Sequence, residues 1–227
     1  MDPTKTEARP APAERNRVAV WDRPVRVVHW LFVILIPFSW WTAEEEMIEW
    51  HQRSGLALLG LLVFRIIWGL IGSSTARFAS FVRGPGTILS YLRGRVASPI
   101  GHNPLGALSV LALLAVLAVQ IGLGLFAADD DWLWPGPLTG LIGEDLAEEL
   151  TEWHEWTFNL LLAAIALHVL AIAFYLLVKR RNLVGPMVTG VVEAPPGTEP
   201  MKGAGAVRFF VAAAAAFAVV SLVWMQA

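Results

Sequence analysis

Residues 153–178 read WHEWTFNLLLAAIALHVLAIAFYLLV, an apolar stretch with no charged side chain after Glu155. A helix needs about 20 apolar residues to cross the hydrocarbon core of a membrane, and this stretch is longer than that. It also holds two histidines, His154 and His168, and ionisable side chains inside a membrane are costly and usually functional. The stretch therefore predicts a membrane-spanning helix that carries part of a functional site.

Four other segments have the length and hydropathy of membrane spans: residues 25–42, 51–71, 105–127 and 207–224. The composition agrees, because 56% of the residues are hydrophobic and only 16% are charged, whereas soluble domains carry about 25% charged residues. The chain has no cysteine, which excludes disulfides, thiolate metal sites and covalent c-type haem attachment within it. We therefore predict an all-α membrane protein.

The charged residues are divided unevenly among the loops. Of the 17 basic residues, all but Arg53 and Arg65 lie before or at the start of the first span, between the second and third spans, or between the fourth span and the start of the fifth. Acidic residues dominate the two opposite loops. Because cytoplasmic loops are enriched in Lys and Arg, we expect the N-terminus in the cytoplasm and, with five spans, the C-terminus in the periplasm. Residues 1–18 are polar and Pro-rich and predict a disordered cytoplasmic tail.

Four of the five histidines form two pairs when each is assigned a depth. His154 and His168 are 14 residues apart, which places them on one helix face within about 40° and about 21 Å apart along the axis. His51 begins the second span at the outer side, and His29 lies at the inner end of the first. Depth then pairs His51 with His154 and His29 with His168. Two facing imidazoles can fill both axial positions of a haem iron, which then serves electron transfer.

Two arginines are expected beside the inner pair. Arg65 follows His51 by 14 residues and Arg26 precedes His29 by three, so both fall on the histidine-bearing faces. A guanidinium is well suited to pair with a haem propionate. Three glycines near the outer pair would let a flat ring approach the backbone: Gly55, Gly122 and Gly124.

Other interpretations of the histidines stay open. A single histidine inside a membrane can be a hydrogen-bonded packing residue or a proton relay. Zinc is a further alternative, but it would need its ligands gathered at one point, whereas these lie at two depths.

In their order and spacing, several stretches resemble the bacterial cytochrome b561 family, which includes the b-type cytochrome subunits of nickel–iron hydrogenases. They cover about residues 19–190 and comprise VWDRPVRVVHW at 20–30, His51 with Gly55, FRIIWGLIG at 64–72, RF at 77–78, FVRGP at 81–85, GHNPLG at 101–106, the helix with His154 and His168, and MVTG at 187–190. The family has a four-helix core that holds two b-type haems.

The resemblance implies a four-helix transmembrane dihaem bundle in a bacterial inner membrane, formed by residues 19–190. Residues 191–206 would then be a linker and residues 207–227 an extra C-terminal transmembrane helix. The family's haem ligands fall on His29, His51, His154 and His168, the four residues that depth selected. His102, in the GHNP stretch, is either a helix-start residue or a contact to quinone or to a haem propionate.

Three functions are consistent with the sequence. The first is a dihaem b-type cytochrome that transfers electrons between quinone and a periplasmic partner, such as a c-type cytochrome or a hydrogenase-like subunit. The second is a self-sufficient superoxide:quinone oxidoreductase, and the third is a haem-free membrane anchor. The acidic outer loops favour a basic electron carrier, although the distribution of charge in membrane proteins explains them equally well. We expect membrane lipid as a partner and no nucleic acid, with a homo-oligomer through the fifth span as a further alternative.

Overall fold

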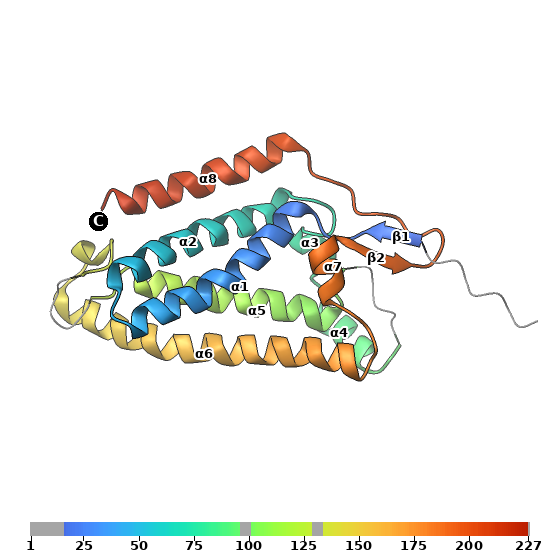
Figure 1. Cartoon of the computed structure of the whole chain (residues 1–227), viewed down its shortest axis with the longest axis horizontal. Helices are drawn as coiled ribbons and strands as arrows, with labels where there is room; N and C mark the ends of the chain where they lie inside the picture. Colours follow the sequence, from blue (N-terminus) through green and yellow to red (C-terminus); the bar gives the residue numbers. More distant parts are fainter. Residues whose placement is uncertain (1–15, 96–100, 129–133, 227) are drawn as a thin grey trace, which may run out of the picture.

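The computed structural model describes residues 16–95, 101–128 and 134–226. Within these ranges, five helices are long and apolar enough to cross a membrane: α1 (Arg23–Glu44), α2 (Ile48–Ile71), α5 (Pro104–Gly124), α6 (Glu144–Leu177) and α8 (Ala206–Trp224). They run along the length of the molecule (Figure 1). The five predicted spans are therefore confirmed. The main difference is at α6, which begins at Glu144 and not at residue 153, where the predicted span begins. Its first turn contains Glu144 and Asp145, and acidic residues there stabilise a helix N-terminus.

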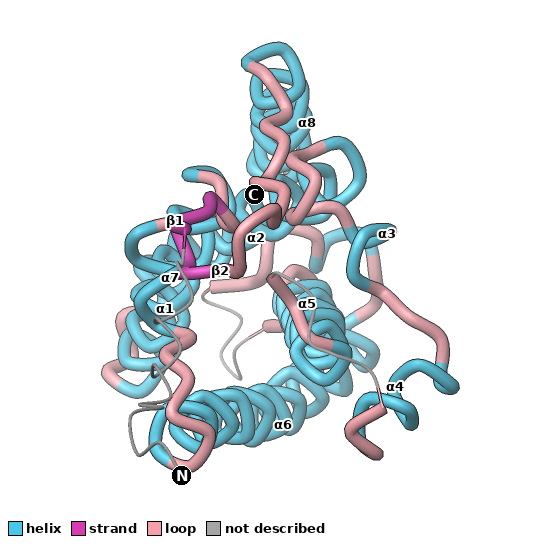
Figure 2. Tube along the Cα trace, turned by 90° about the vertical axis from the view of Figure 1, so that its right-hand side faces the viewer, coloured by secondary structure: helices cyan, strands magenta, loops and turns pink. Residues whose placement is uncertain are grey.

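Four of these helices surround a common axis, and the fifth lies outside them. Viewed along the molecule in Figure 2, α1, α2, α5 and α6 form a ring, and α8 lies beyond α2. Close backbone contacts join α1 to α2, α2 to α5, α5 to α6, and α2 to α8. Among the described residues, α6 approaches α1 and α2 less closely than it approaches α5. The predicted arrangement, an all-α membrane bundle, is confirmed.

Two buried hydrophobic clusters hold the ring together. One joins Leu59 and Leu62 of α2 to Leu117 and Ile121 of α5 and Leu161 of α6. The other packs the start of α1 against α2 and α8, and its buried residues include Val25, Val28, Phe64, Trp68 and Ala212. Small residues let helix backbones approach closely in a membrane, and Ala212 and Ala216 are the buried residues of α8.

A small strand pair closes the basic end of the bundle. Strand β1 (Asn16–Ala19) pairs antiparallel with β2 (Val191–Ala194), and α7 (Val184–Thr189) precedes β2. Residues 16–18 were expected in the tail and residues 191–194 in the linker, so both expectations are corrected at these positions. The pairing joins segments far apart in the sequence, which no local pattern reveals. Residues 1–15 of the predicted tail lie outside the described residues.

The segment between α2 and α5 contains two short helices, α3 (Phe78–Phe81) and α4 (Pro85–Leu92). The apolar residues that stand among the arginines of residues 75–95 predict a single amphipathic helix lying in the headgroup region, whereas the structure has two helices there. A proline disfavours the helical conformation of the residue before it, and Gly84, which precedes Pro85, is extended. The loop between α5 and α6, at the opposite end, contains the 3₁₀ helix η1 (Thr139–Leu141).

Candidate functional site

His51 of α2 and His154 of α6 face each other at the acidic end of the bundle. Their ring centroids are 6.1 Å apart and their planes are inclined at 87°. A metal–imidazole nitrogen bond is about 2 Å long, so one metal ion between two rings would place their centroids about 6 Å apart. The structure therefore brings this predicted pair together, and the two rings would be able to hold one metal ion between them.

Backbone carbonyls hold both rings. His51 Nδ1 lies 2.8 Å from the carbonyl oxygen of Ser39, and His154 Nδ1 lies 2.9 Å from that of Gln120. An Nδ1–H that donates to a carbonyl leaves Nε2 with a free lone pair, which is the usual arrangement in metal-binding histidines. Ser39 and Gln120 are both buried, so these contacts are shielded from water.

Gln120 is a site residue that the sequence analysis missed. Its side-chain nitrogen lies 3.2 Å from both ring nitrogens of His154, and its side-chain oxygen accepts a hydrogen bond from the Thr157 hydroxyl. A glutamine in the apolar interior of α5 was the available signal, because polar side chains inside membrane helices usually have a partner. Gln120 thus connects α5 to the histidine-bearing face of α6.

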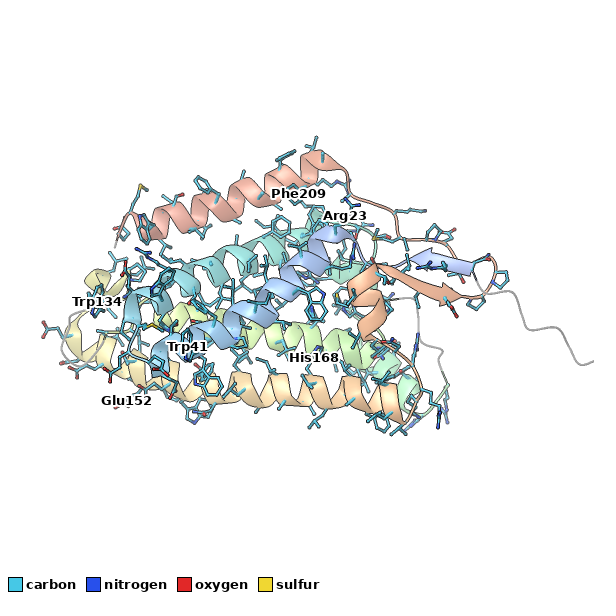
Figure 3. The ribbon with its side chains drawn as sticks, in the orientation of Figure 1. Arg23, Trp41, Trp134, Glu152, His168 and Phe209 are labelled. Atoms are coloured by element: carbon cyan, nitrogen blue, oxygen red, sulfur yellow. The ribbon has the colours of Figure 1, made fainter. Side chains whose placement is uncertain are left out.

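The second predicted pair lies toward the basic end. His29 of α1 and His168 of α6 are within range of a direct electrostatic interaction. His168 Nδ1 lies 3.2 Å from the Ser109 hydroxyl of α5, whereas His29 Nδ1 is buried without a hydrogen-bond partner among the described residues. Figure 3 labels His168 on α6, with Arg23 toward the basic end and Trp41, Trp134 and Glu152 toward the acidic end.

Buried polar atoms without partners gather at this basic end. Within the described residues, the side-chain atoms that are buried without a hydrogen bond are Arg26 Nε, His29 Nδ1, Arg65 Nη1, Ser73 Oγ and His102 Nδ1. An unpaired buried polar group costs about 1–3 kcal/mol, and more when it is charged. A ligand that carries carboxylates would satisfy several of them. The residues at this end therefore fit a haem with its propionates.

Arg65 is the most buried of the cations here. Only 6% of its surface is exposed, and its guanidinium carbon lies 5.1 Å from the centre of the Phe78 ring. The Arg65 guanidinium interacts electrostatically with the carboxylate of Asp22. That carboxylate accepts hydrogen bonds from the Val25 amide and the Trp68 indole. Arg65 keeps a free Nη1, so an anionic group can bind there.

His102 lies between two aromatic rings just before α5 begins. Its ring centroid is 4.6 Å from that of Trp21 and 4.5 Å from that of Phe81. Burial lowers the pKa of His102 to about 3, and the nearby charges of Arg65 and His168 act in the same direction. His102 is therefore neutral near pH 7 and can serve as a hydrogen-bond partner, not as a cation.

The three predicted glycines differ in their surroundings. A Cβ atom added at Gly124 would lie 2.7 Å from Cε1 of His154, so only a glycine fits against this ring. Added Cβ atoms at Gly55 and Gly122 would meet nothing within 4 Å. Of the three, the structure places Gly124 directly against a predicted ligand.

Arg26 lies at the contact of α1 with α7, where its Nη1 donates a hydrogen bond to the Val188 carbonyl. No group of three or more His, Asp or Glu side chains within the described ranges is placed to hold a metal ion. The histidines instead form pairs that bridge α6 to α1 and to α2, the helices that α6 approaches less closely. Haem sites in helical bundles are likewise formed by side chains on facing helices.

A family model described as Prokaryotic cytochrome b561 matches residues 20–190. No curated protein and no solved structure matches the chain. The matched range contains α1 to α7, and with them all five histidines, Arg26 and Arg65. It ends before β2 and α8.

Proposed function

Because the chain belongs to the prokaryotic cytochrome b561 family, whose members are membrane proteins that bind b-type haem and transfer electrons, we propose that it conducts electrons across the membrane through two haems. The exchange partners in this proposal are quinone and a periplasmic redox protein, such as a c-type cytochrome or a hydrogenase-like subunit. The observation that carries the proposal is the His51–His154 pair, with its ring centroids 6.1 Å apart and both Nδ1 atoms held by carbonyls.

In this proposal His51 and His154 hold one haem, and His29 and His168 hold the other. Haem, when bound by two histidines, supplies reversible one-electron transfer at an iron that has no open position for substrate. The Ser39 and Gln120 carbonyls accept from Nδ1–H of the outer rings and so leave Nε2 as the nitrogen that would bind the metal. The Ser109 hydroxyl would orient the His168 ring through its contact with Nδ1.

The basic end would bind the anionic and polar groups of the ligands. Arg65, with its free Nη1, is placed to pair with a propionate. His102 is neutral, and its Nδ1 is buried without a partner among the described residues, so it suits a hydrogen bond to a propionate or to a quinone carbonyl. Arg26 is a further propionate partner in this proposal. In this proposal, three glycines would leave space beside the haem held by His51 and His154: Gly55, Gly122 and Gly124.

We further propose that the basic end faces the cytoplasm of a bacterial inner membrane. Support comes from the basic residues at the end formed by α3, α4 and α7, and from the acidic residues at the opposite end. His51 and His154 then lie on the periplasmic side, next to the external partner, and His29 and His168 lie on the cytoplasmic side.

The test is a redox titration of the visible spectrum of the purified protein, combined with a pyridine haemochrome count. Two haems per chain with two midpoint potentials are expected. One haem per chain would contradict the dihaem assignment, and a spectrum without a b-type band would leave the haem-free anchor. Reduction of the haem by superoxide without any partner protein would favour the superoxide:quinone oxidoreductase.

A further inference from the structure

A groove of about 480 Å³ runs along the lipid-facing side of α1, where this helix meets α7. Two arginines, Arg23 and Arg26, lie at its basic end, and Val27, Leu31 and Ile34 continue along α1. The three apolar residues fall on one helix face over a rise of about 10 Å. The groove is therefore cationic at the membrane boundary and apolar toward the membrane interior.

Two hydrogen bonds keep the walls of the groove together. Arg26 Nη1 donates to the Val188 carbonyl, and Trp30 Nε1 donates to the Met187 carbonyl at 3.2 Å. Both bonds join α1 to α7, which is too short to hold its position alone. The groove is thus formed by tertiary contacts and is present before any ligand binds.

Neither cation of the groove has an Asp or Glu partner among the described residues. Arg23 is exposed and makes no ion pair or side-chain hydrogen bond within the part of the chain that the structure describes. Arg26 Nη1 donates a hydrogen bond to the Val188 carbonyl, and Arg26 Nε is buried without a partner among the described residues. The groove lining contains no Asp or Glu. Two guanidinium groups above an apolar strip match a phosphate that is attached to acyl chains.

We propose that this groove binds an anionic phospholipid, with its phosphate on Arg23 and Arg26 and an acyl chain along Val27, Leu31 and Ile34. Phosphatidylglycerol and cardiolipin have this chemistry. A neutral quinone ring offers no charge to two guanidinium groups, so the groove favours lipid over quinone. The proposal requires only that the chain spans a membrane, and it holds whatever the number of haems.

Native mass spectrometry of the purified holoprotein, titrated with phosphatidylglycerol or phosphatidylcholine, tests the proposal. We expect binding of phosphatidylglycerol in preference to phosphatidylcholine, and affinity about tenfold weaker in Arg23→Gln because a charge-assisted contact is lost. Arg93→Gln is the matched control, because Arg93 is an exposed arginine of the same end that does not line the groove. The haem content should stay unchanged in both variants.

Three results would overturn the lipid site. They are equal affinity for the two lipids, equal weakening by Arg23→Gln and Arg93→Gln, and retention of quinone in place of phospholipid by the wild-type groove. None of them alters the haem count, so failure of the lipid site is distinguishable from failure of the dihaem proposal.

Discussion

The difference between His154 and His102 lies in what holds each ring. A backbone carbonyl binds Nδ1 of His154, and its ring centroid lies 6.1 Å from that of His51 on the facing helix. His102 instead lies between the rings of Trp21 and Phe81, tilted by 57° and 50° against them, and its Nδ1 has no partner among the described residues. The first arrangement suits a metal ligand, and the second suits a residue that contacts a polar group of a ligand.

We expect His154→Ala to lose one haem and to keep the other, because His168 lies about four helical turns away on α6. The haemochrome count should fall from two haems per chain to one. His102→Gln is the control and should retain both haems. Two haems in His154→Ala would contradict the ligand assignment.

Gly124→Ala should disturb the outer site, because the added Cβ would lie 2.7 Å from Cε1 of His154 and the ring would have to move. We expect the haem content to fall from two toward one per chain. Gly140→Ala, in η1 at the same end of the bundle, is the control, since its Cβ would also meet nothing within 4 Å and the residue has no part in the proposed haem site. Equal haem contents and potentials in the two variants would argue against this role for Gly124.

The histidine pairs could be predicted from sequence because a helix has a fixed rise and twist, so a spacing of 14 residues defines both face and depth. The hydrogen-bond partners of these histidines could not be predicted from the sequence. Ser39, Ser109 and Gln120 become recognisable only when a neighbouring helix places them beside a ring, and packing sets that rotation. Of the three, only Gln120 is unusual enough in its helix to be noticed in advance.

At the scale of elements, α7 and the strand pair fasten the start of α1 to the end of the matched region. The Gly190 carbonyl accepts a hydrogen bond from the Val20 amide at 2.8 Å, next to β1. Gly190 has φ of 83°, the left-handed conformation that glycine adopts without strain. This residue therefore fixes the turn from α7 into β2.

Gly190→Ala should lower the free energy of unfolding by about 1–3 kcal/mol, since alanine is strained at positive φ. Its Cβ would also lie 2.9 Å from the Trp21 carbonyl oxygen. The measurement is the Tm of the purified protein in detergent. Gly86→Ala is the control, because it lies in α4 with open space around its Cβ, and its Tm should be unchanged or slightly raised. Equal Tm values in both variants would show that this turn does not limit stability.

The spans could be predicted because hydropathy and length are local properties of the chain. Strands β1 and β2 are only four residues long and each depends on the other, so neither has a local signal of its own. The division of residues 75–95 into α3 and α4 was missed for a different reason. The amphipathic pattern of these residues predicts one continuous helix, but the Gly84–Pro85 pair interrupts it.

At the scale of the whole molecule, the proposed topology has five spans and places residues 16 and 226 on opposite sides of the membrane. Alkaline phosphatase fused after residue 226 should be active, because the enzyme requires the periplasm, and the same enzyme fused after residue 181 should be inactive. The reason is the basic cluster after α6, which the proposed orientation keeps in the cytoplasm. The reverse pattern of activities would invert the proposed orientation.

The acidic end should make electron exchange with a basic carrier sensitive to salt. Screening shortens the range of electrostatic attraction from about 30 Å at 0.01 M to about 8 Å at 0.15 M. We therefore expect the rate of haem reduction by a basic c-type cytochrome to fall several-fold over this range in stopped-flow measurements. An uncharged small-molecule reductant is the control and should show no such change. A salt-independent rate with the cytochrome would contradict an electrostatic attraction between the acidic end and a basic carrier.

The sequence by itself determined the class of the molecule, its five spans and the assignment of four histidines to two depths. Those properties follow from hydropathy, length and helical periodicity, which act along one segment at a time. Only the tertiary structure decided which atoms meet: the facing rings of His51 and His154, the Gln120 contact, the unpaired polar atoms at the basic end and the groove of α1 with α7. Each of these depends on the rotation and distance of a second helix, which is set by packing among all the helices.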